Sequence, residues 1–238
     1  MAVALSVVVP VKDEGENVAP LAREIAAAVG ADAEIIFVDD GSSDETIPVL
    51  QSLKSEIRGL RVISHGRNFG QSRGVRTGVR AATADIVATL DGDGQNNPAD
   101  LPRLVAALRD AGPKVGMVAG VRRTRMDDAN RRFASNFANT FRRSLLNDGA
   151  EDSGCGIKAF RRDAFLALPY FDNIHRFIIA LMQREGYEVR FLDVDHRPRA
   201  HGKSKYSNWQ RALVGISDTF GVRWLQKRFK GPVEPREI

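Results

Sequence analysis

Residues 85–95 read Asp-Ile-Val-Ala-Thr-Leu-Asp-Gly-Asp-Gly-Gln. The apolar run predicts a short buried strand, and two carboxylates follow where the strand ends. The next residues, Asn97-Pro98, predict the start of a helix. Carboxylate and amide oxygens suit a hard divalent cation, which keeps several waters and also binds phosphate oxygens. We therefore expect Asp91, Asp93 and Gln95 to hold Mg²⁺ or Mn²⁺.

Such a cation neutralises the charge on a departing diphosphate, so the stretch indicates chemistry on a nucleotide sugar. An Asp-x-Asp pair is also common in turns, where Asp and Gly satisfy backbone hydrogen bonds. The acidic stretch alone therefore leaves a purely structural turn open.

The first forty residues predict a strand-helix-strand unit. Residues 5–9 and 35–38 are apolar runs typical of buried strands, and residues 17–29 carry apolar side chains at helical spacing before Gly30. In open, mostly parallel sheets, ligands bind at the carboxyl ends of the strands. The polar side chains expected to converge there are Lys12, Glu14, Asp40, Asp91 and Asp93. One of Asp39 and Asp40 is equally suited to cap the helix expected over residues 45–53.

Four motifs occur in order: Val-Pro-Val-Lys-Asp-Glu-Gly-Glu-Asn (9–17), Val-Asp-Asp-Gly-Ser-Ser-Asp-Glu-Thr (38–46), Arg-Asn-Phe-Gly (67–70) and Asp-Gly-Asp-Gly-Gln (91–95). Together they resemble the family 2 glycosyltransferases. Asp-Ser-Gly-Cys-Gly (152–156) and the basic stretch 197–205 are similar to the polyprenyl-phosphate branch, typified by dolichyl-phosphate mannose synthase. The resemblance covers roughly residues 3–210.

The resemblance implies a GT-A fold: a single Rossmann-like α/β domain with a mostly parallel sheet flanked by helices. It implies inverting transfer of a hexose from a nucleotide-diphosphate sugar, GDP-mannose by default or a UDP-sugar, to a polyprenyl phosphate. The positions that match nucleotide-binding residues of this branch are Pro10, Lys12, Glu14, Val38, Asp40, Asp91 and Gly92. Many relatives have an aromatic residue in place of Lys12, which leaves guanine and uracil both open.

The same resemblance assigns catalytic roles. The positions that match residues facing the two phosphate groups are Arg122, Arg131, Arg199 and Lys205, with Asp93 on the metal. Arg132 is an alternative to Arg131. A phosphate monoester is mostly dianionic at neutral pH, so it needs no general base. A sugar hydroxyl would need a carboxylate base near Asp152, which is as well suited to pair with an arginine.

Composition agrees with one catalytic domain. The 238 residues are 43% hydrophobic and 27% charged, with one cysteine and a formal net charge of +5. We expect a catalytic domain over residues 1–206, an amphipathic helix over 207–230 and a tail over 231–238. The single cysteine fits a reducing cytoplasm. No basic leader precedes the first strand, and no apolar run reaches the roughly 20 residues that span a bilayer.

Many relatives in this branch carry transmembrane helices, so the contact with a lipid acceptor needs another explanation. Residues 208–230 and 129–146 each combine an apolar stripe with arginines and lysines, a pattern typical of helices at a membrane interface. Either stripe is equally suited to packing on the sheet. We expect a peripheral protein on the cytoplasmic face of an anionic membrane, with an integral-membrane partner as a further option.

Two other functions remain open from the sequence. One is a glycosyltransferase that acts on a saccharide hydroxyl. The other is a non-catalytic basic protein that binds a membrane or another anion. No recognisable reading motif for nucleic acid is present.

Overall fold

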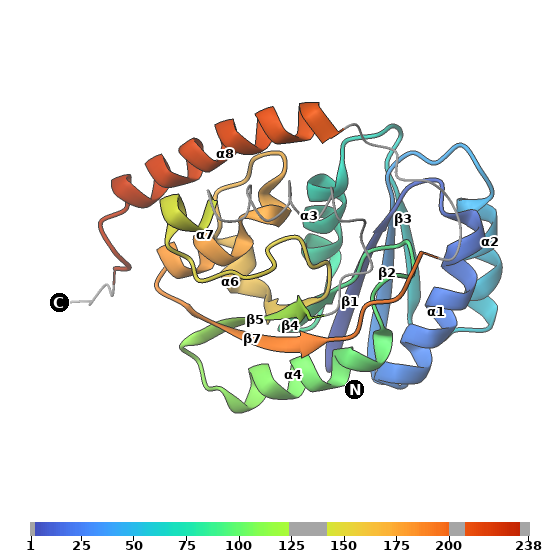
Figure 1. Ribbon diagram of the computed structural model, residues 1–238. Coiled ribbons are helices and arrows are strands. Elements are labelled where there is room, and N and C mark those ends of the chain that lie inside the picture. Colours follow the sequence, from blue (N-terminus) through green and yellow to red (C-terminus); the bar gives the residue numbers. More distant parts are fainter. Residues whose placement is uncertain (1–2, 124–141, 200–207, 234–238) are drawn as a thin grey trace.

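The computed structural model describes residues 3–123, 142–199 and 208–233 (Figure 1). The described residues form a sheet of seven strands in the order β3-β2-β1-β4-β6-β5-β7. The strands are β1 (Leu5–Val11), β2 (Ala33–Asp39), β3 (Leu60–Ser64), β4 (Ile86–Thr89), β5 (Val115–Arg122), β6 (Lys158–Arg161) and β7 (Glu188–Val194). Only β6 runs antiparallel to its two neighbours, β4 and β5.

Helices cover both faces of the sheet (Figure 1). One face carries α1 (Gly15–Val29), α2 (Thr46–Ser52) with η1 (Leu53–Ser55), and η2 (Pro98–Asp100) with α4 (Leu101–Asp110). The other carries α3 (Gln71–Ala81), α6 (Arg162–Leu166), η3 (Ile174–Arg176), α7 (Ile178–Arg184) and α8 (Asn208–Arg228). Every residue of β1 and β2 is buried as a result, which is typical of parallel strands with two covered faces.

These elements confirm the expected α/β fold. The strands predicted over residues 5–9 and 35–38 lie within β1 and β2, and the helix predicted over 17–29 begins two residues earlier. Asn97 caps η2 as expected, since its side chain accepts the backbone N–H of Ala99 at 3.1 Å. Most of the helix predicted over 129–146 lies outside the described residues.

The antiparallel strand β6 determines what reaches the site. Val8 of β1 is aligned with Thr89 of β4, and Thr89 is aligned in turn with Lys158. The first residue of β6 therefore lies at the carboxyl ends of β1 and β4. Segments before β6 thus share a crevice with the acidic stretch that follows β4.

Helix α8 packs on α7 along one side. Val222 is buried, Gln226 Nε2 donates to the Leu146 carbonyl at 3.1 Å, and Arg184 Nε donates to the Leu225 carbonyl at 3.2 Å. The opposite side carries exposed apolar residues: Val214, Ile216, Phe220 and Trp224. In the described part of the chain, no helix has the length and apolar character needed to cross a membrane.

Candidate active site

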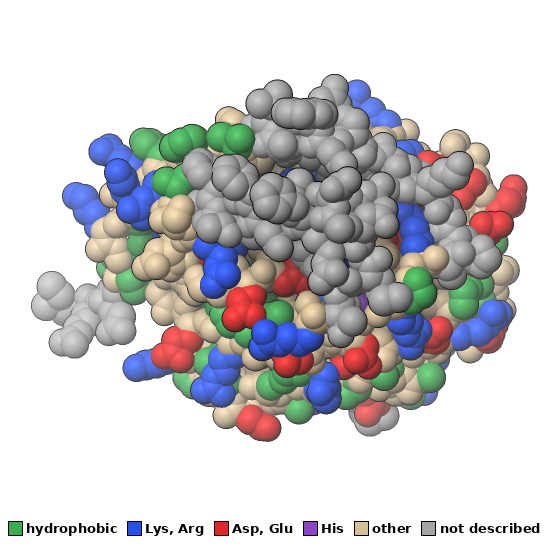
Figure 2. Space-filling view, in the orientation of Figure 1, with side chains coloured by type: hydrophobic (Ala, Val, Ile, Leu, Met, Phe, Trp, Pro, Cys, Tyr) green, Lys and Arg blue, Asp and Glu red, His purple; other side chains and the backbone are tan. Residues whose placement is uncertain are grey.

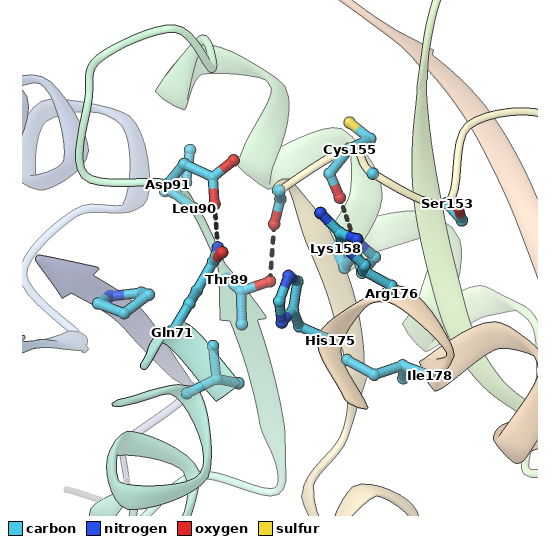
Figure 3. A pocket seen from close by; sticks show the side chains of 14 residues that line it. Gln71, Thr89, Leu90, Asp91, Ser153, Cys155, Lys158, His175, Arg176 and Ile178 are labelled. Atoms are coloured by element: carbon cyan, nitrogen blue, oxygen red, sulfur yellow. Dashed lines mark hydrogen bonds between the residues drawn. The ribbon is translucent and has the colours of Figure 1, made fainter. Parts of the chain in front are cut away.

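The acidic stretch forms a turn at the end of β4. The backbone N–H of Asp91 donates to Asn96 Oδ1 at 3.1 Å, and that of Gln95 donates to Asp93 Oδ1 at 3.2 Å. Gln71, the first residue of α3, donates from Nε2 to Asp91 Oδ1 at 2.7 Å (Figure 3). These contacts fix the Asp91 carboxylate at the edge of the crevice. The turn proposed as an alternative role for this stretch is therefore present, and it positions the carboxylates.

The electrostatics of Asp91 favour a cation. Burial and the charge of Asp93 raise the pKa of Asp91 to about 6, although Lys158, Arg122 and the Gln71 hydrogen bond act in the opposite direction. A divalent cation between two carboxylates removes this penalty, because it replaces their repulsion by attraction. The donor set of Asp91, Asp93 and Gln95 offers oxygens only, which suits Mg²⁺ or Mn²⁺.

Two glycines let other segments approach this turn. A Cβ at Gly156 would lie 2.2 Å from Asp91 Oδ2, and a Cβ at Gly92 would lie 2.5 Å from Val11 Cγ1. Thr89 Oγ1 donates to the Gly156 carbonyl at 2.9 Å and holds the segment there. The Asp-Ser-Gly-Cys-Gly motif therefore packs directly against the predicted metal ligand.

A pocket of about 190 Å³ opens beside Asp91. Figure 3 shows Gln71, Thr89 and Asp91 on one side, and Lys158, His175 and Arg176 on the other. The remaining lining residues are Pro10, Val75, Leu90, Ser153, Gly154, Cys155, Gly156 and Ile178. Lys158 is buried, and burial lowers the pKa of its ammonium group, although nearby acidic groups including Asp91 oppose this.

The acids after β2 have structural partners. Asp39 accepts the backbone N–H groups of Gly41 and Ser42 and so holds the turn that leads towards α2. The expected cap of the helix by Asp39 or Asp40 was wrong, because Asp44 accepts the N–H of Thr46, the first residue of α2. Asp40 Oδ1 lies 2.8 Å from His65 Nδ1 and accepts the Phe69 N–H at 2.9 Å, while Oδ2 accepts the Gly70 N–H at 2.7 Å. Both Asp40 oxygens therefore hold the segment that leads into α3.

Arg122, expected to face phosphate, forms a two-pronged ion pair with Asp152. Arg122 Nε lies 2.6 Å from Asp152 Oδ2, and Nη2 lies 2.8 Å from Oδ1. Burial acts to lower the pKa of Arg122, but Asp152 holds it above its ordinary value. Asp152 thus has the arginine partner that one alternative gave it.

The other predicted nucleotide residues lie around the ends of β1 and β2. Pro10 lines the pocket, and Lys12 Nζ donates to the Gly41 carbonyl at 2.9 Å. Glu14 accepts from Asn17 Nδ2 at 2.6 Å and pairs with Arg199. Val38 is fully buried in the core, so its side chain has no surface for a ligand.

Arg131 and its alternative Arg132 lie outside the described residues, as does Lys205. Arg199 is brought to the crevice through its ion pair with Glu14.

The pocket residues that were not predicted from the sequence include Gln71, Lys158, His175 and Arg176. Lys158 carried the clearest signal, because it is a lysine inside the otherwise apolar run Ile-Lys-Ala-Phe. Gln71 follows the Arg-Asn-Phe-Gly motif directly, and this position was the signal that could have found it. His175 and Arg176 carried no comparable signal.

A model of the family described as Glycosyl transferase family 2 matches residues 6–168. This chain belongs to that family. The family assignment confirms the resemblance carried by the four motifs. The match spans β1, the acidic turn after β4 and the Asp-Ser-Gly-Cys-Gly segment.

Curated members of family 2 similar to this chain include two transferases. The chain is 36% identical over 231 residues to an undecaprenyl-phosphate 4-deoxy-4-formamido-L-arabinose transferase of Enterobacter sp., with 93% of the chain and 69% of the relative covered. It is 34% identical over 225 residues to a dodecaprenyl-phosphate galacturonate synthase of Rhizobium johnstonii, with 92% and 64% covered. The chain thus spans about two thirds of the length of these relatives.

Solved structures share the family 2 fold. Glucosyl-3-phosphoglycerate synthase from Mycobacterium tuberculosis, in complex with Mg²⁺ and UDP, superimposes with a TM-score of 0.70 at 18% identity, covering 97% of this chain and 81% of the other. Mannosyltransferase PcManGT from Pyrobaculum calidifontis, in complex with GDP-Man and Mn²⁺, gives a TM-score of 0.68 at 19% identity, covering 99% and 67%. These likenesses confirm the GT-A fold.

Proposed function

We propose that this glycosyltransferase transfers a hexose, with inversion, from a nucleotide-diphosphate sugar to a polyprenyl phosphate. The observation that carries the proposal is the position of the Asp91 carboxylate at the end of β4, where Gln71 holds it in the crevice and Gly156 packs against it. The relatives named for undecaprenyl- and dodecaprenyl-phosphate support the acceptor class.

Asp91, Asp93 and Gln95 would hold Mg²⁺ or Mn²⁺. When bound, the cation would stabilise the charge that develops on the departing diphosphate. Gln71 would keep Asp91 oriented, and Gly92 would allow the turn to approach β1 closely. We therefore propose that transfer requires a divalent cation. The Mn²⁺ present in the PcManGT complex supports this.

The nucleotide would bind over the ends of β1 and β2. Its base and ribose are assigned to Pro10, Lys12, Glu14, the backbone of Val38, and Asp40. Because Asp40 already holds the 65–70 segment, it would contribute mainly by fixing the wall of this site. GDP-mannose is the default donor by family resemblance. A UDP-sugar is the alternative.

The state of Asp152 supports a phosphate acceptor over a sugar hydroxyl. A hydroxyl acceptor needs a carboxylate that is able to take up a proton. Both oxygens of Asp152 are engaged by Arg122, which disfavours its protonation. A dianionic phosphate needs positive charge in place of a base, and Arg122, Arg131, Arg199 and Lys205 are assigned that role.

The exposed side of α8 would meet the membrane. Figure 2 shows hydrophobic and basic side chains together along this helix, at the upper left. The exposed row Ile216, Phe220 and Trp224 recurs every four residues, with Arg223 and Lys227 nearby. Such a surface fits peripheral binding to anionic lipid on the cytoplasmic face. An integral-membrane partner is the other contact that this surface would suit.

The test uses the full chain with a panel of radiolabelled GDP- and UDP-sugars, polyprenyl phosphate and MnCl₂. Label is expected in the organic phase with one donor, and chelation by EDTA should abolish it. Transfer of label to a water-soluble saccharide alone would contradict the acceptor assignment. Binding to anionic vesicles without transfer to any acceptor would contradict the proposal that the protein is a catalyst.

A further inference from the structure

The pocket beside Asp91 has a basic end. Lys158, His175 and Arg176 line this end together (Figure 3). Among the described residues that line the pocket, Asp91 is the one carboxylate, and it is assigned to the metal as a ligand. Arg176 also acts on the carboxylate of Asp218 in α8. Lys158 is therefore the cation of this end whose charge the metal site leaves unexplained.

Lys158 has less compensation than a buried ammonium normally has. It is 4% exposed, and its contact among the described residues is a hydrogen bond to the Cys155 carbonyl. An ammonium has three donors, and no described carboxylate lies within ion-pair distance of this one. Burying a charge without an opposite charge is costly, so buried cations are normally paired.

His175 and Arg176 are held in place beside it. His175 Nδ1 lies 2.7 Å from Ser72 Oγ, which also accepts the His175 backbone N–H at 3.3 Å. A Cβ at Gly215 of α8 would lie 3.8 Å from Arg176 Nη1. The basic end of the pocket therefore extends from β6 to the underside of α8.

The volume limits what this end can hold. About 190 Å³ is smaller than the roughly 300–1,000 Å³ of pockets that enclose drug-sized ligands, so this end of the pocket suits a small group. A phosphate group or one sugar ring does. Charge-assisted hydrogen bonds from lysine and arginine are the usual means of binding phosphate and carboxylate.

We propose that Lys158, with His175 and Arg176, forms a subsite for a phosphate or carboxylate group of a substrate, separate from the site of the donor diphosphate. This inference rests on the proposed function for its two sources: the acceptor phosphate, or the carboxylate of an acidic donor sugar. In either case, the anion supplies the ion-pair contact that the buried Lys158 does not make with the described carboxylates, although Asp91 and Asp152 act on it from a greater distance.

The first arm tests anion binding without catalysis. Inorganic phosphate should raise the Tm of the full chain by about 2–4 °C over sodium chloride of equal ionic strength. In Lys158→Met, which keeps the side-chain volume, at least half of this shift should disappear. Lys54→Met, at an exposed position in η1, should retain it. Equal phosphate shifts in all three proteins would overturn the subsite.

The second arm identifies the source of the anion. A Lys158→Met variant with a KM for polyprenyl phosphate raised at least about tenfold, and an unchanged KM for the donor, assigns the acceptor phosphate. If Lys158→Met lowers kcat/KM at least about tenfold for a UDP-uronate, but not for the matching neutral UDP-hexose, the anion is the sugar carboxylate. No change in either comparison overturns the proposal.

If Lys158→Met does not unfold cooperatively, Arg176→Gln takes its place in both arms. The phosphate arm does not depend on transfer. Failure of the proposed function therefore appears as absence of transfer by the wild-type chain, while failure of the subsite appears in the phosphate shifts.

Discussion

Two acidic pairs follow buried strands on either side of β1, and the chain uses them differently. Asp39 and Asp40, after β2, accept backbone N–H groups from the turn and from the 65–70 segment. Asp91, after β4, has a single described hydrogen-bond donor, the side chain of Gln71, and a raised pKa. Hydrogen bonds from backbone N–H groups thus identify Asp39 and Asp40 as structural. Charge repulsion and the small number of hydrogen-bond donors identify Asp91 and Asp93 as the pair suited to a cation.

The largest expected effect is on catalysis at the second pair. Asp91→Asn should lower glycosyl transfer by about 10³-fold or more, because a metal ligand that stabilises several kcal/mol of developing charge is removed. The measurement is the initial rate of organic-phase labelling at saturating MnCl₂. Asp85→Asn, at an exposed carboxylate just before the same strand, should retain the wild-type rate. Comparable rates for Asp91→Asn and wild type would show that Asp91 has no role in catalysis.

The first pair should matter for stability instead. Asp40→Ala removes the acceptor of the Phe69 N–H and one of the two acceptors of the Gly70 N–H, which keeps Asn68 Oδ1 at 2.9 Å. The expected loss in the free energy of unfolding is about 2 kcal/mol, since these hydrogen bonds are partly buried and an unsatisfied buried group costs about 1–3 kcal/mol. Urea unfolding followed by circular dichroism measures it, with Asp85→Ala as the exposed control. A loss as small as that of the control would show that Asp40 is not structural.

Asp91 should have the opposite effect on stability when no metal is bound. Its pKa in the folded chain, about 6, is above the unfolded value, so folded protein binds the proton more tightly. The resulting stabilisation is present below about pH 4 and is lost as the pH rises through about 6. With EDTA at pH 7.5, Asp91→Asn should therefore be more stable than wild type by the order of 2 kcal/mol.

This difference should shrink at pH 4.5, and MnCl₂ at pH 7.5 should stabilise wild type but not the variant. Thermal unfolding at the two pH values measures it. A variant that is less stable than wild type in EDTA at pH 7.5 would place Asp91 with the structural acids.

The smallest effect concerns the glycine that packs against Asp91. Gly156→Ala places a Cβ 2.2 Å from Asp91 Oδ2, so the carboxylate must move. Mn²⁺ affinity, measured by titration calorimetry, should fall about tenfold, which is about 1.4 kcal/mol. Gly154→Ala is the matched control, because its Cβ would lie 3.6 Å from the nearest atom, Arg122 Nη2. Equal Mn²⁺ affinities in the two variants would show that Gly156 does not position the metal ligand.

Much of the fold was predictable because its signals are local. β1 and β2 are continuous apolar runs, and Asn97 caps η2. The position of Asp91 at a strand end followed from the same pattern. The pocket was less predictable. His175 comes from η3, which approaches the site through Ser72 across 103 residues of sequence.

By itself, the sequence determined the family, the strand-helix order and an acidic turn after the fourth strand, because each depends on neighbouring residues. The tertiary structure alone decided which acids and bases have partners. Arg122 meets Asp152 across 30 residues, and the antiparallel register of β6 brings Lys158 to the end of β4. Such contacts depend on strand order and register, and these are set by packing of the whole sheet rather than by any local pattern.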